Sequence, residues 1–159
     1  MIVLDIIDED FVNYKKSSMT ILMPYCSFKC NSSYNKEICQ NYQLKFSDKI
    51  NISSKALIER YLINPISESI VFQGLEPFDS WDDLYEFISL IRITYKCDDD
   101  IVIYTGYNIE EIQSKIDQLR GFHNIIIKFG RYIPDQEKHF DNVLGVYLAS
   151  DNQYTERIS

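Results

Sequence analysis

The sequence lacks the features that define several large classes of protein. It contains no apolar run long enough to span a bilayer, and its first residues lack the charged, apolar and cleavable pattern of a secretory signal. Internal repeats and low-complexity linkers are also absent. Basic residues are in the minority, at 16 Lys and Arg against 24 Asp and Glu, so the net charge is −8. Duplex-DNA binders gain affinity by neutralising phosphates, and we expect a cytoplasmic protein that binds neither nucleic acid nor membranes.

Histidine and cysteine are both scarce, and their spacing limits the metal sites that the chain can form. The two histidines, His123 and His139, lack the paired spacing of a Cys/His zinc site. Three of the four cysteines, Cys26, Cys30 and Cys39, lie in one stretch, "CSFKCNSSYNKEICQN". In a reducing cytoplasm such cysteines are expected to be free, metal-binding or catalytic, because disulfides form mainly in oxidising compartments.

The pattern of apolar residues predicts an α/β fold. A chain of 159 residues, 45% of them hydrophobic, can bury a proper core, and we expect residues 1–159 to form a single domain. From residue 54 on, amphipathic helices alternate with continuous apolar strands. The predicted helices are 53–63, 79–95 and 108–120, and the predicted strands are 68–74, 100–107 and 123–130. Such an alternation is typical of a parallel sheet covered by helices.

Further strands are expected on either side of this region. They are 1–6, 11–14, 19–24 and 142–150. The first two flank an acidic stretch, "IDED" at residues 7–10, which predicts a turn. The third is a buried strand that runs directly into Cys26.

Four of the predicted strands end in residues that can bind a ligand. These endings are Cys26 after "ILMPY", "QGLEP" after "SIVF", "TGY" after "IVIY" and "KFGR" after "NIII". In open sheets of parallel strands, ligands bind outside the carboxyl ends of the strands. We therefore expect the four endings to gather at one edge of the sheet, with the cysteine loop where a cofactor binds.

The three clustered cysteines allow more than one kind of site. Three thiolates leave a four-coordinate centre one ligand short, as in a [4Fe–4S] cluster with one iron open to an exogenous ligand. The eight residues before Cys39 are no serious obstacle, because lengthening a two-residue gap to eight costs about 1.2 kcal/mol of closure entropy. Structural zinc with His123 or His139 as the fourth ligand, or three unrelated thiols, are the other interpretations that the spacing leaves open. The fourth cysteine, Cys97, follows a predicted helix and is expected to be a lone thiol.

The sequence around the cysteines is similar to that of a known family. The stretch "NYKKSSMTILMPYCSFKC" resembles the entry to the cluster loop of radical S-adenosylmethionine (SAM) proteins, and most of all the activating proteins of anaerobic ribonucleotide reductases, which are glycyl-radical enzyme activases. Those proteins carry a C-x3-C-x2-C loop followed by an aromatic residue and Asn. Cys26 and Cys30 match this loop, but Ser33 stands at the third position. The simplest interpretation is an insertion that moves the third ligand to Cys39, in a variant C-x3-C-x8-C loop that keeps the Asn as Asn41.

Further motifs follow in the order that the family shows. "FQGLEPF" (72–78) resembles its Gly-Gly-Glu-Pro motif, and "IVIYTGYNIEEI" (101–112) resembles its Tyr-Thr-Gly-Tyr strand end. "IIIKFGRYI" and "LGVYLASDNQ" resemble its closing segments, and the likeness covers about residues 10–157. The departures from the family pattern are Tyr25, the displaced cysteine, Leu75, Lys128 and Ala149. These departures affect the inference about the substrate more than the inference about the cofactor.

The resemblance implies an open, partial (β/α) barrel of mostly parallel strands, because the chain is shorter than the roughly 250 residues of a complete eight-stranded barrel. One side of such a barrel is open to a large substrate. The implied cofactors are a [4Fe–4S] cluster and SAM, with reductive cleavage of SAM to a 5′-deoxyadenosyl radical. The implied partners are a glycyl-radical enzyme, such as the large subunit of an anaerobic ribonucleotide reductase, and a flavodoxin- or ferredoxin-like electron donor. The alternatives are a radical SAM enzyme with another substrate, and a non-catalytic zinc- or cluster-binding module of the same fold.

The same resemblance implies roles for residues of the cysteine loop and the strand that follows it. Cys26, Cys30 and Cys39 would bind the cluster. Ile38 would pack on the adenine of SAM. Glu76 would accept a hydrogen bond from the SAM ammonium, and charge-assisted bonds of this kind are strong. Taken alone, Glu76 reads as an ordinary turn carboxylate.

The remaining implied cofactor-binding residues lie at the other strand ends. Gly74 would let the backbone approach SAM closely, because glycine has no Cβ. Thr105 and Gly106 would face the ribose, and Lys128 would pair with the SAM carboxylate. Without the resemblance, these four residues read as ordinary turn residues and a surface lysine.

Two further segments have an expected role. Asn152 and Gln153 would close the site by the same resemblance. The gap between the second and third cysteines is either a spacer or a partner contact, and in the second case Tyr34, Lys36 and Glu37 would touch the partner, because loops carry recognition on rigid scaffolds.

Overall fold

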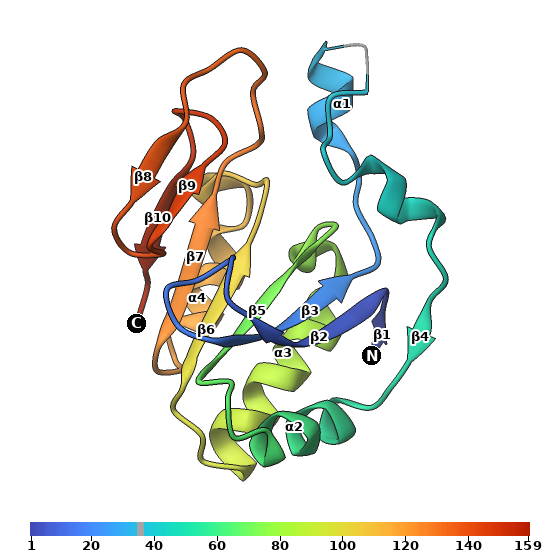
Figure 1. Ribbon diagram of the computed structural model, residues 1–159, viewed down its shortest axis with the longest axis vertical. Coiled ribbons are helices and arrows are strands. Elements are labelled where there is room, and N and C mark those ends of the chain that lie inside the picture. Colours follow the sequence, from blue (N-terminus) through green and yellow to red (C-terminus); the bar gives the residue numbers. More distant parts are fainter. Residues whose placement is uncertain (35–36) are drawn as a thin grey trace.

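The computed structural model describes residues 1–34 and 37–159, which form an open sheet with helices on one face (Figure 1). The sheet has six strands in the spatial order β10 (Tyr154–Arg157), β7 (Ile125–Phe129), β6 (Asp100–Tyr104), β5 (Ser69–Gly74), β3 (Ser18–Met23) and β2 (Asp5–Asp10). The four inner strands run parallel, and both edge strands run antiparallel to their neighbours. The predicted parallel sheet is therefore present, with one antiparallel strand added at each edge.

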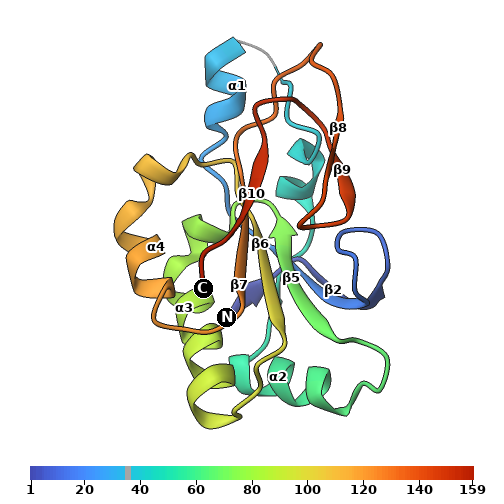
Figure 2. The same ribbon diagram turned by 90° about the vertical axis from the view of Figure 1, so that its left-hand side faces the viewer.

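Three helices connect the parallel strands and cover one face of the sheet. Helix α2 (Ser54–Ile63) precedes β5, α3 (Trp81–Ser89) precedes β6, and α4 (Gln113–Leu119) precedes β7. Figure 2 shows α3 and α4 on the same side of β6 and β7. The core on this face contains Leu57, Ile58, Leu84, Phe87, Ile88, Ile116 and Leu119 from the helices, and Ile70, Phe72, Ile101, Ile103, Ile125 and Ile127 from the strands. Every second strand residue points to this face, because successive side chains of a strand alternate.

The opposite face of the sheet is covered by a loop and a hairpin. Val71, Val102 and Ile126 form a second core there with Tyr14 and Leu144. Tyr14 belongs to the loop between β2 and β3, and Leu144 belongs to the turn between β8 (His139–Asp141) and β9 (Val146–Leu148), which pair antiparallel. Because both of its faces are buried, the inner part of the sheet has the continuous apolar strands that the sequence shows.

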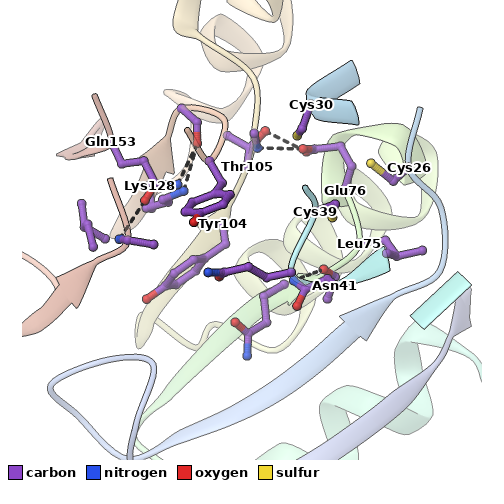
Figure 3. A pocket seen from close by; sticks show the side chains of 18 of the residues that line it. Cys26, Cys30, Cys39, Asn41, Leu75, Glu76, Tyr104, Thr105, Lys128 and Gln153 are labelled. Atoms are coloured by element: carbon purple, nitrogen blue, oxygen red, sulfur yellow. Dashed lines mark hydrogen bonds between the residues drawn. The ribbon is translucent and has the colours of Figure 1, made fainter. Parts of the chain in front are cut away.

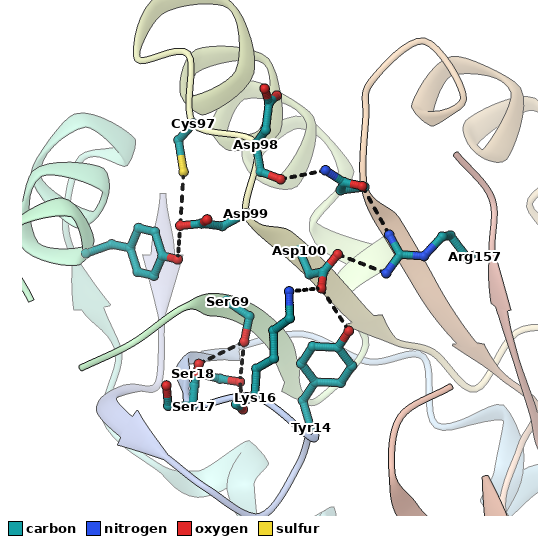
Figure 4. A network of polar contacts seen from close by, with 12 residues as sticks. Tyr14, Lys16, Ser17, Ser18, Ser69, Cys97, Asp98, Asp99, Asp100 and Arg157 are labelled. Carbon is teal, nitrogen blue, oxygen red and sulfur yellow. Dashed lines mark hydrogen bonds and ion pairs between the residues drawn. The ribbon is translucent and has the colours of Figure 1, made fainter. Parts of the chain in front are cut away.

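A polar network holds the amino-terminal end of β6 (Figure 4). The buried carboxylate of Asp100 accepts hydrogen bonds from Tyr14 Oη and Arg157 Nη2, each at 2.9 Å. It also forms an ion pair of 2.6 Å with Lys16 Nζ. Burial by itself raises the pKa of Asp100, but these three donors together hold it below its ordinary value of 3.8. The network ties the β2–β3 loop and β10 to the end of the sheet that lies opposite the carboxyl ends of the strands.

Some of the expected strand boundaries are wrong. The acidic segment 7–10 is no turn but part of β2, and residues 11–14 form the loop that follows it. Because β2 is an edge strand, its polar side chains can face solvent. Asp10 ends the strand by accepting a hydrogen bond of 2.8 Å from the backbone N–H of Val12. The expected strand 142–150 is also too long, because only Val146–Leu148 (β9) form a strand within it.

The remaining elements are short. They are β1 (Ile2–Val3), which pairs with β4 (Ile50–Asn51), α1 (Lys29–Tyr34), the 3₁₀ helices Tyr42–Phe46, Pro77–Ser80 and Ile109–Glu111, and the π-helical turn Leu90–Thr94 that continues α3. Within the described residues β10 and β2 do not pair with each other, so the sheet is open. Its description as a partial (β/α) barrel stays a prediction. No helix in the described part of the chain is long and apolar enough to cross a membrane.

Candidate functional site

A cavity of about 350 Å³ opens where β3, β5, β6 and β7 end (Figure 3). Most of the residues that the sequence analysis singles out line it, namely Cys26, Cys30, Cys39, Asn41, Gly74, Glu76, Thr105, Gly106, Lys128 and Gln153. The expectation that four strand endings meet at one edge is confirmed, because parallel strands place their carboxyl ends on the same side.

Two of the expected site residues do not line this cavity in the described structure. Ile38 is half-buried, and its backbone N–H donates to Asn31 Oδ1 at 3.1 Å. Asn152 is exposed, and its Nδ2 donates to the carbonyl of Arg131 at 2.9 Å. Asn152 therefore holds the turn after β7, while Gln153 is the residue of this pair that reaches the cavity.

The cysteine loop folds back on itself through one side chain. Cys26 follows β3, Cys30 lies in α1, and Cys39 lies after the longer gap. Asn31 Oδ1 accepts hydrogen bonds from the backbone N–H groups of Ile38 and Cys39, at 3.1 Å each. Asn side chains readily form such bonds to nearby backbone, and here they return Cys39 to the cavity that the other two cysteines line.

The middle of the cysteine loop is described only in part. Lys36 and the side chain of Tyr34 lie outside the residues that the structure describes. Glu37 is exposed. The expectation that these residues contact a partner stays a prediction.

Hydrogen bonds tie both ends of the cysteine loop to neighbouring strand ends. The backbone N–H of Ser27 donates to Asp79 Oδ2 at 2.8 Å, and Asn41 Nδ2 donates to the carbonyl of Gly74 at 2.8 Å. Gly74 has a φ of +91°, and a Cβ at this position would lie 3.0 Å from the backbone nitrogen of Met23. Only glycine suits this conformation and this close approach, so Gly74 is needed where it presents its carbonyl to Asn41.

The three thiols fit an iron–sulfur cluster better than a single metal ion. Within the described residues, no three His, Cys, Asp or Glu side chains are grouped so that they could hold one ion. The described lining of the cavity also contains no histidine, so neither His123 nor His139 is placed to be the fourth ligand of a zinc ion there. A cluster binds each thiolate to a different iron, so its ligands surround a volume instead of converging on one point. Three thiols around one cavity meet that requirement.

Burial keeps the thiols of Cys26 and Cys30 protonated in the absence of metal. It raises the pKa of Cys26 to about 12, with the negative charges of Glu76 and Asp79 adding to the rise. Burial also raises the pKa of Cys30; the neighbouring Cys39 adds to this effect, whereas the charge of Arg131 opposes it. Because thiolates are the metal ligands, cluster binding must displace these protons.

Glu76 is a buried carboxylate that three donors hold in place (Figure 3). Its Oε1 accepts hydrogen bonds from Thr105 Oγ1 at 2.7 Å and from the backbone N–H of Phe78 at 3.1 Å. Its Oε2 accepts from the backbone N–H of Gly106 at 2.8 Å. Burial raises the pKa of Glu76 to about 7, although these donors oppose the rise. A carboxylate has about four acceptor positions, so within the described chain one is left for a ligand in the cavity.

The contacts of Glu76 change the interpretation of two neighbours. Thr105 and Gly106 line the cavity, as expected, but both donate to the carboxylate of Glu76. Their observed contacts therefore orient Glu76. A direct contact of either residue with a ribose stays a prediction.

Lys128 brings a positive charge into the same cavity. It is buried, and its Nζ donates to the carbonyl of Gly130 at 3.0 Å. Burial lowers the pKa of Lys128 to about 8, while the negative charge of Glu76 opposes this change. Gln153 Nε2 donates to the same carbonyl at 3.1 Å and so fixes the turn. A protonated lysine has three donors, and in the described chain two of them are left for an anion.

None of the sequence motifs indicates the wall of the cavity that lies on the second face of the sheet. Tyr104 Oη donates to the carbonyl of Asn13 at 2.5 Å, and both residues line the cavity together with Tyr147. Tyr104 is the last residue of β6, and that position was a usable signal. Nothing in the local sequence marks Asn13 or Tyr147, which reach the cavity from the β2–β3 loop and from β9.

Comparison with known proteins agrees with the chemistry of this cavity. A family model described as a 4Fe-4S single cluster domain matches residues 16–154. This match spans the cysteine loop and every strand ending that contributes to the cavity. No curated protein and no solved structure matches the chain.

Proposed function

The chain belongs to the 4Fe-4S single cluster domain family and is an iron–sulfur protein, and from that premise we propose that it is a radical SAM enzyme. The family is one associated with radical SAM proteins. Cys26, Cys30 and Cys39 are the cluster ligands in this proposal, and the iron that they leave open is where SAM binds.

The observation that carries the proposal is the pair of opposite charges in the cavity of the cysteines. Glu76 offers an acceptor position and Lys128 offers donors, and both line the cavity of the three thiols. SAM ends in an amino acid, which has one ammonium and one carboxylate. A buried acid and a buried base beside the cluster ligands provide one partner for each of these two groups.

The residues of this chain would hold and orient SAM. A bound cluster would supply the single electron for reductive cleavage of SAM to methionine and a 5′-deoxyadenosyl radical. Glu76 accepts a hydrogen bond from the ammonium, and Thr105 and Gly106 keep its carboxylate oriented. Lys128 pairs with the SAM carboxylate, and Gln153 holds the turn that positions it. Such orientation is what the protein contributes when a cofactor carries the chemistry.

We propose a glycyl-radical enzyme, such as an anaerobic ribonucleotide reductase, as the target of the radical. The support is the order of the sequence motifs and the open sheet, which in a partial (β/α) barrel leaves one side for a large substrate. A flavodoxin- or ferredoxin-like protein is the proposed electron donor. The adenine contact of Ile38 rests on the resemblance alone, because Ile38 does not line the cavity in the described structure.

The proposal is tested by anaerobic reconstitution with iron and sulfide, followed by reduction with dithionite in the presence of SAM. We expect about four irons per chain, a brown protein, and formation of 5′-deoxyadenosine and methionine. A protein that takes up the cluster but leaves SAM intact would be a non-catalytic cluster module. A colourless protein that takes up zinc in place of iron would contradict the assignment of the cysteines.

A further inference from the structure

The cysteine loop has a second side, on which two cationic side chains lie near the thiols. A small cavity of about 20 Å³ lies there between the loop and the ends of β6 and β7. Its lining residues are Cys26, Ser27, Lys29, Cys30, Glu76, Gly106, Tyr107 and Arg131. Two thiols therefore share a cavity wall with a lysine and an arginine, in a protein whose net charge is −8.

The guanidinium of Arg131 is held at a defined position on this wall. Its Nη1 and Nη2 donate to the two carboxylate oxygens of Glu111, at 2.7 Å each, which is a bidentate ion pair. Its Cζ lies 5.5 Å from the centre of the Tyr107 ring, a cation–π distance. Its Cγ would lie 3.6 Å from a Cβ at Gly106, so the alkyl chain packs beside the strand end. The side chain is 20% exposed.

The same arrangement reaches the cysteine loop directly. Tyr107 Oη donates to Asp79 Oδ1 at 2.6 Å, and Asp79 Oδ2 accepts from the backbone N–H of Ser27 at 2.8 Å. Lys29 Nζ lies 4.8 Å from the centre of the Tyr107 ring and 3.8 Å from Glu111 Oε1. Tyr107 and Glu111 therefore hold two cations against the loop that carries the first two cysteines.

We propose that Arg131 is a positioning residue that raises the reduction potential of the cluster through its charge beside Cys30, and that Glu111 holds it there and partly offsets that charge. The inference rests on the assignment of the cysteines as cluster ligands, and it is independent of SAM. Reduction adds one negative charge to a centre that three thiolates already make negative. A fixed positive charge next to a ligand favours the reduced state, because cluster potentials follow net charge and local environment.

The effect of substitutions on the potential distinguishes a purely structural role of the Arg131–Glu111 ion pair from an electrostatic role. Arg131→Gln and Glu111→Gln both break the same pair, so loosening of the loop would change the potential in the same direction in both variants. If the charges of Arg131 and Glu111 set the potential of the cluster, the potentials of the two variants must shift in opposite directions. Arg131→Gln removes a positive charge and disfavours reduction, whereas Glu111→Gln removes a negative charge and favours it.

The experiment is a redox titration of the reconstituted protein, followed by absorbance and electron paramagnetic resonance without SAM. We expect Arg131→Gln to lower the equilibrium constant for reduction about tenfold, which for one electron is a shift of about 59 mV to more negative potential. Glu111→Gln should shift the potential to more positive values, and Arg131→Lys, which keeps the charge, should restore most of the parent value. The matched control is Arg120→Gln, which breaks an exposed ion pair with Asp117 and should leave the potential unchanged.

The outcomes separate this inference from the proposed function. Shifts of the same sign in Arg131→Gln and Glu111→Gln, or no shift in either, would overturn the role of Arg131 while the cluster assignment stands. If Arg131→Gln does not retain iron, the potential of Glu111→Gln still tests the proposal. A shift to more negative potential in Glu111→Gln, or no shift, contradicts it. Failure of the parent protein to take up a cluster would contradict the proposed function itself.

Discussion

The side chain of Asn31 accepts a hydrogen bond from the backbone N–H of Cys39 at 3.1 Å, and the same oxygen accepts from Ile38 at 3.1 Å. The residue directly after the second cysteine thus determines where the third one lies. A gap of eight residues would otherwise leave Cys39 free to adopt many positions, at a cost in entropy when it binds. Asn31 therefore prepares the third ligand before any metal is present.

We predict that Asn31→Ala weakens the attachment of the cluster without changing the fold. Loss of these bonds should cost about 1–2 kcal/mol, which makes the loss of iron to a chelator about five- to thirtyfold faster. The measurement is the decay of cluster absorbance in the presence of an iron chelator under anaerobic conditions. Ser32→Ala is the matched control, because Ser32 is exposed in the same short helix α1. Equal decay rates in Asn31→Ala and the parent protein would show that the loop is held in another way.

We predict that the four cysteines divide into three ligands and one bystander. Cys26, Cys30 and Cys39 line the cavity, whereas Cys97 lies near the amino-terminal end of β6, where its Sγ contacts Asp99 Oδ2 at 3.4 Å (Figure 4). Serine at any of the first three positions should abolish the cluster, and Cys97→Ser should retain it. Iron and sulfide content after anaerobic reconstitution is the measurement. Retention of a full cluster in Cys39→Ser would show that Cys39 is not the third ligand.

We predict that Glu76→Gln lowers the affinity for SAM and leaves the cluster in place. The substitution keeps the shape of the side chain but removes the charge that the SAM ammonium would meet. Hydrogen bonds to charged groups contribute about 1.5–3 kcal/mol, so the affinity should fall roughly ten- to a hundredfold. Thr105→Val, which removes one donor to Glu76, should have a smaller effect in the same direction. Equilibrium binding of SAM to the reconstituted proteins tests this, and unchanged affinity in Glu76→Gln would leave the carboxylate with a structural role.

We predict that Asp100 makes the stability of the metal-free protein depend on acid pH. The pKa of Asp100 is raised by burial, but Lys16, Arg157 and Tyr14 outweigh that effect and lower it below its ordinary value of 3.8. A carboxylate with a lowered folded-state pKa stabilises the protein above its unfolded-state pKa, and this stability is lost as the pH falls through the folded-state pKa. Asp100→Asn should therefore unfold at lower urea concentration than the parent protein at pH 7.

Comparison of the parent protein with Asp100→Asn at several pH values is the control for this prediction. As the pH falls below 3.8, the parent protein should lose stability toward the level of Asp100→Asn, because its carboxylate is then protonated as well. Urea denaturation at several pH values measures the difference between the two proteins. A difference that stays constant down to the lowest pH would show that packing, and not charge, is what Asn disturbs.

The sequence by itself determined the inner sheet and the edge where the site lies. Continuous apolar runs at β5, β6 and β7 alternate with amphipathic helices, and this pattern is local, so it can be recognised within each segment. Parallel strands place their carboxyl ends on one side. For that reason Cys26, Glu76, Thr105 and Lys128 could be assigned to one cavity without a structure.

The tertiary structure alone decided what these residues touch. Thr105 and Gly106 donate to Glu76, about 30 positions earlier in the chain, and Arg131 is paired with Glu111 of the 3₁₀ helix Ile109–Glu111. The β2–β3 loop and β9 bring Asn13 and Tyr147 to the cavity without any local signal. The physical reason is that the partner of a polar side chain depends on which distant segments pack together. Hydrophobic periodicity fixes the inward face of an element, whereas the hydrogen bonds at its end form only after the whole sheet is assembled.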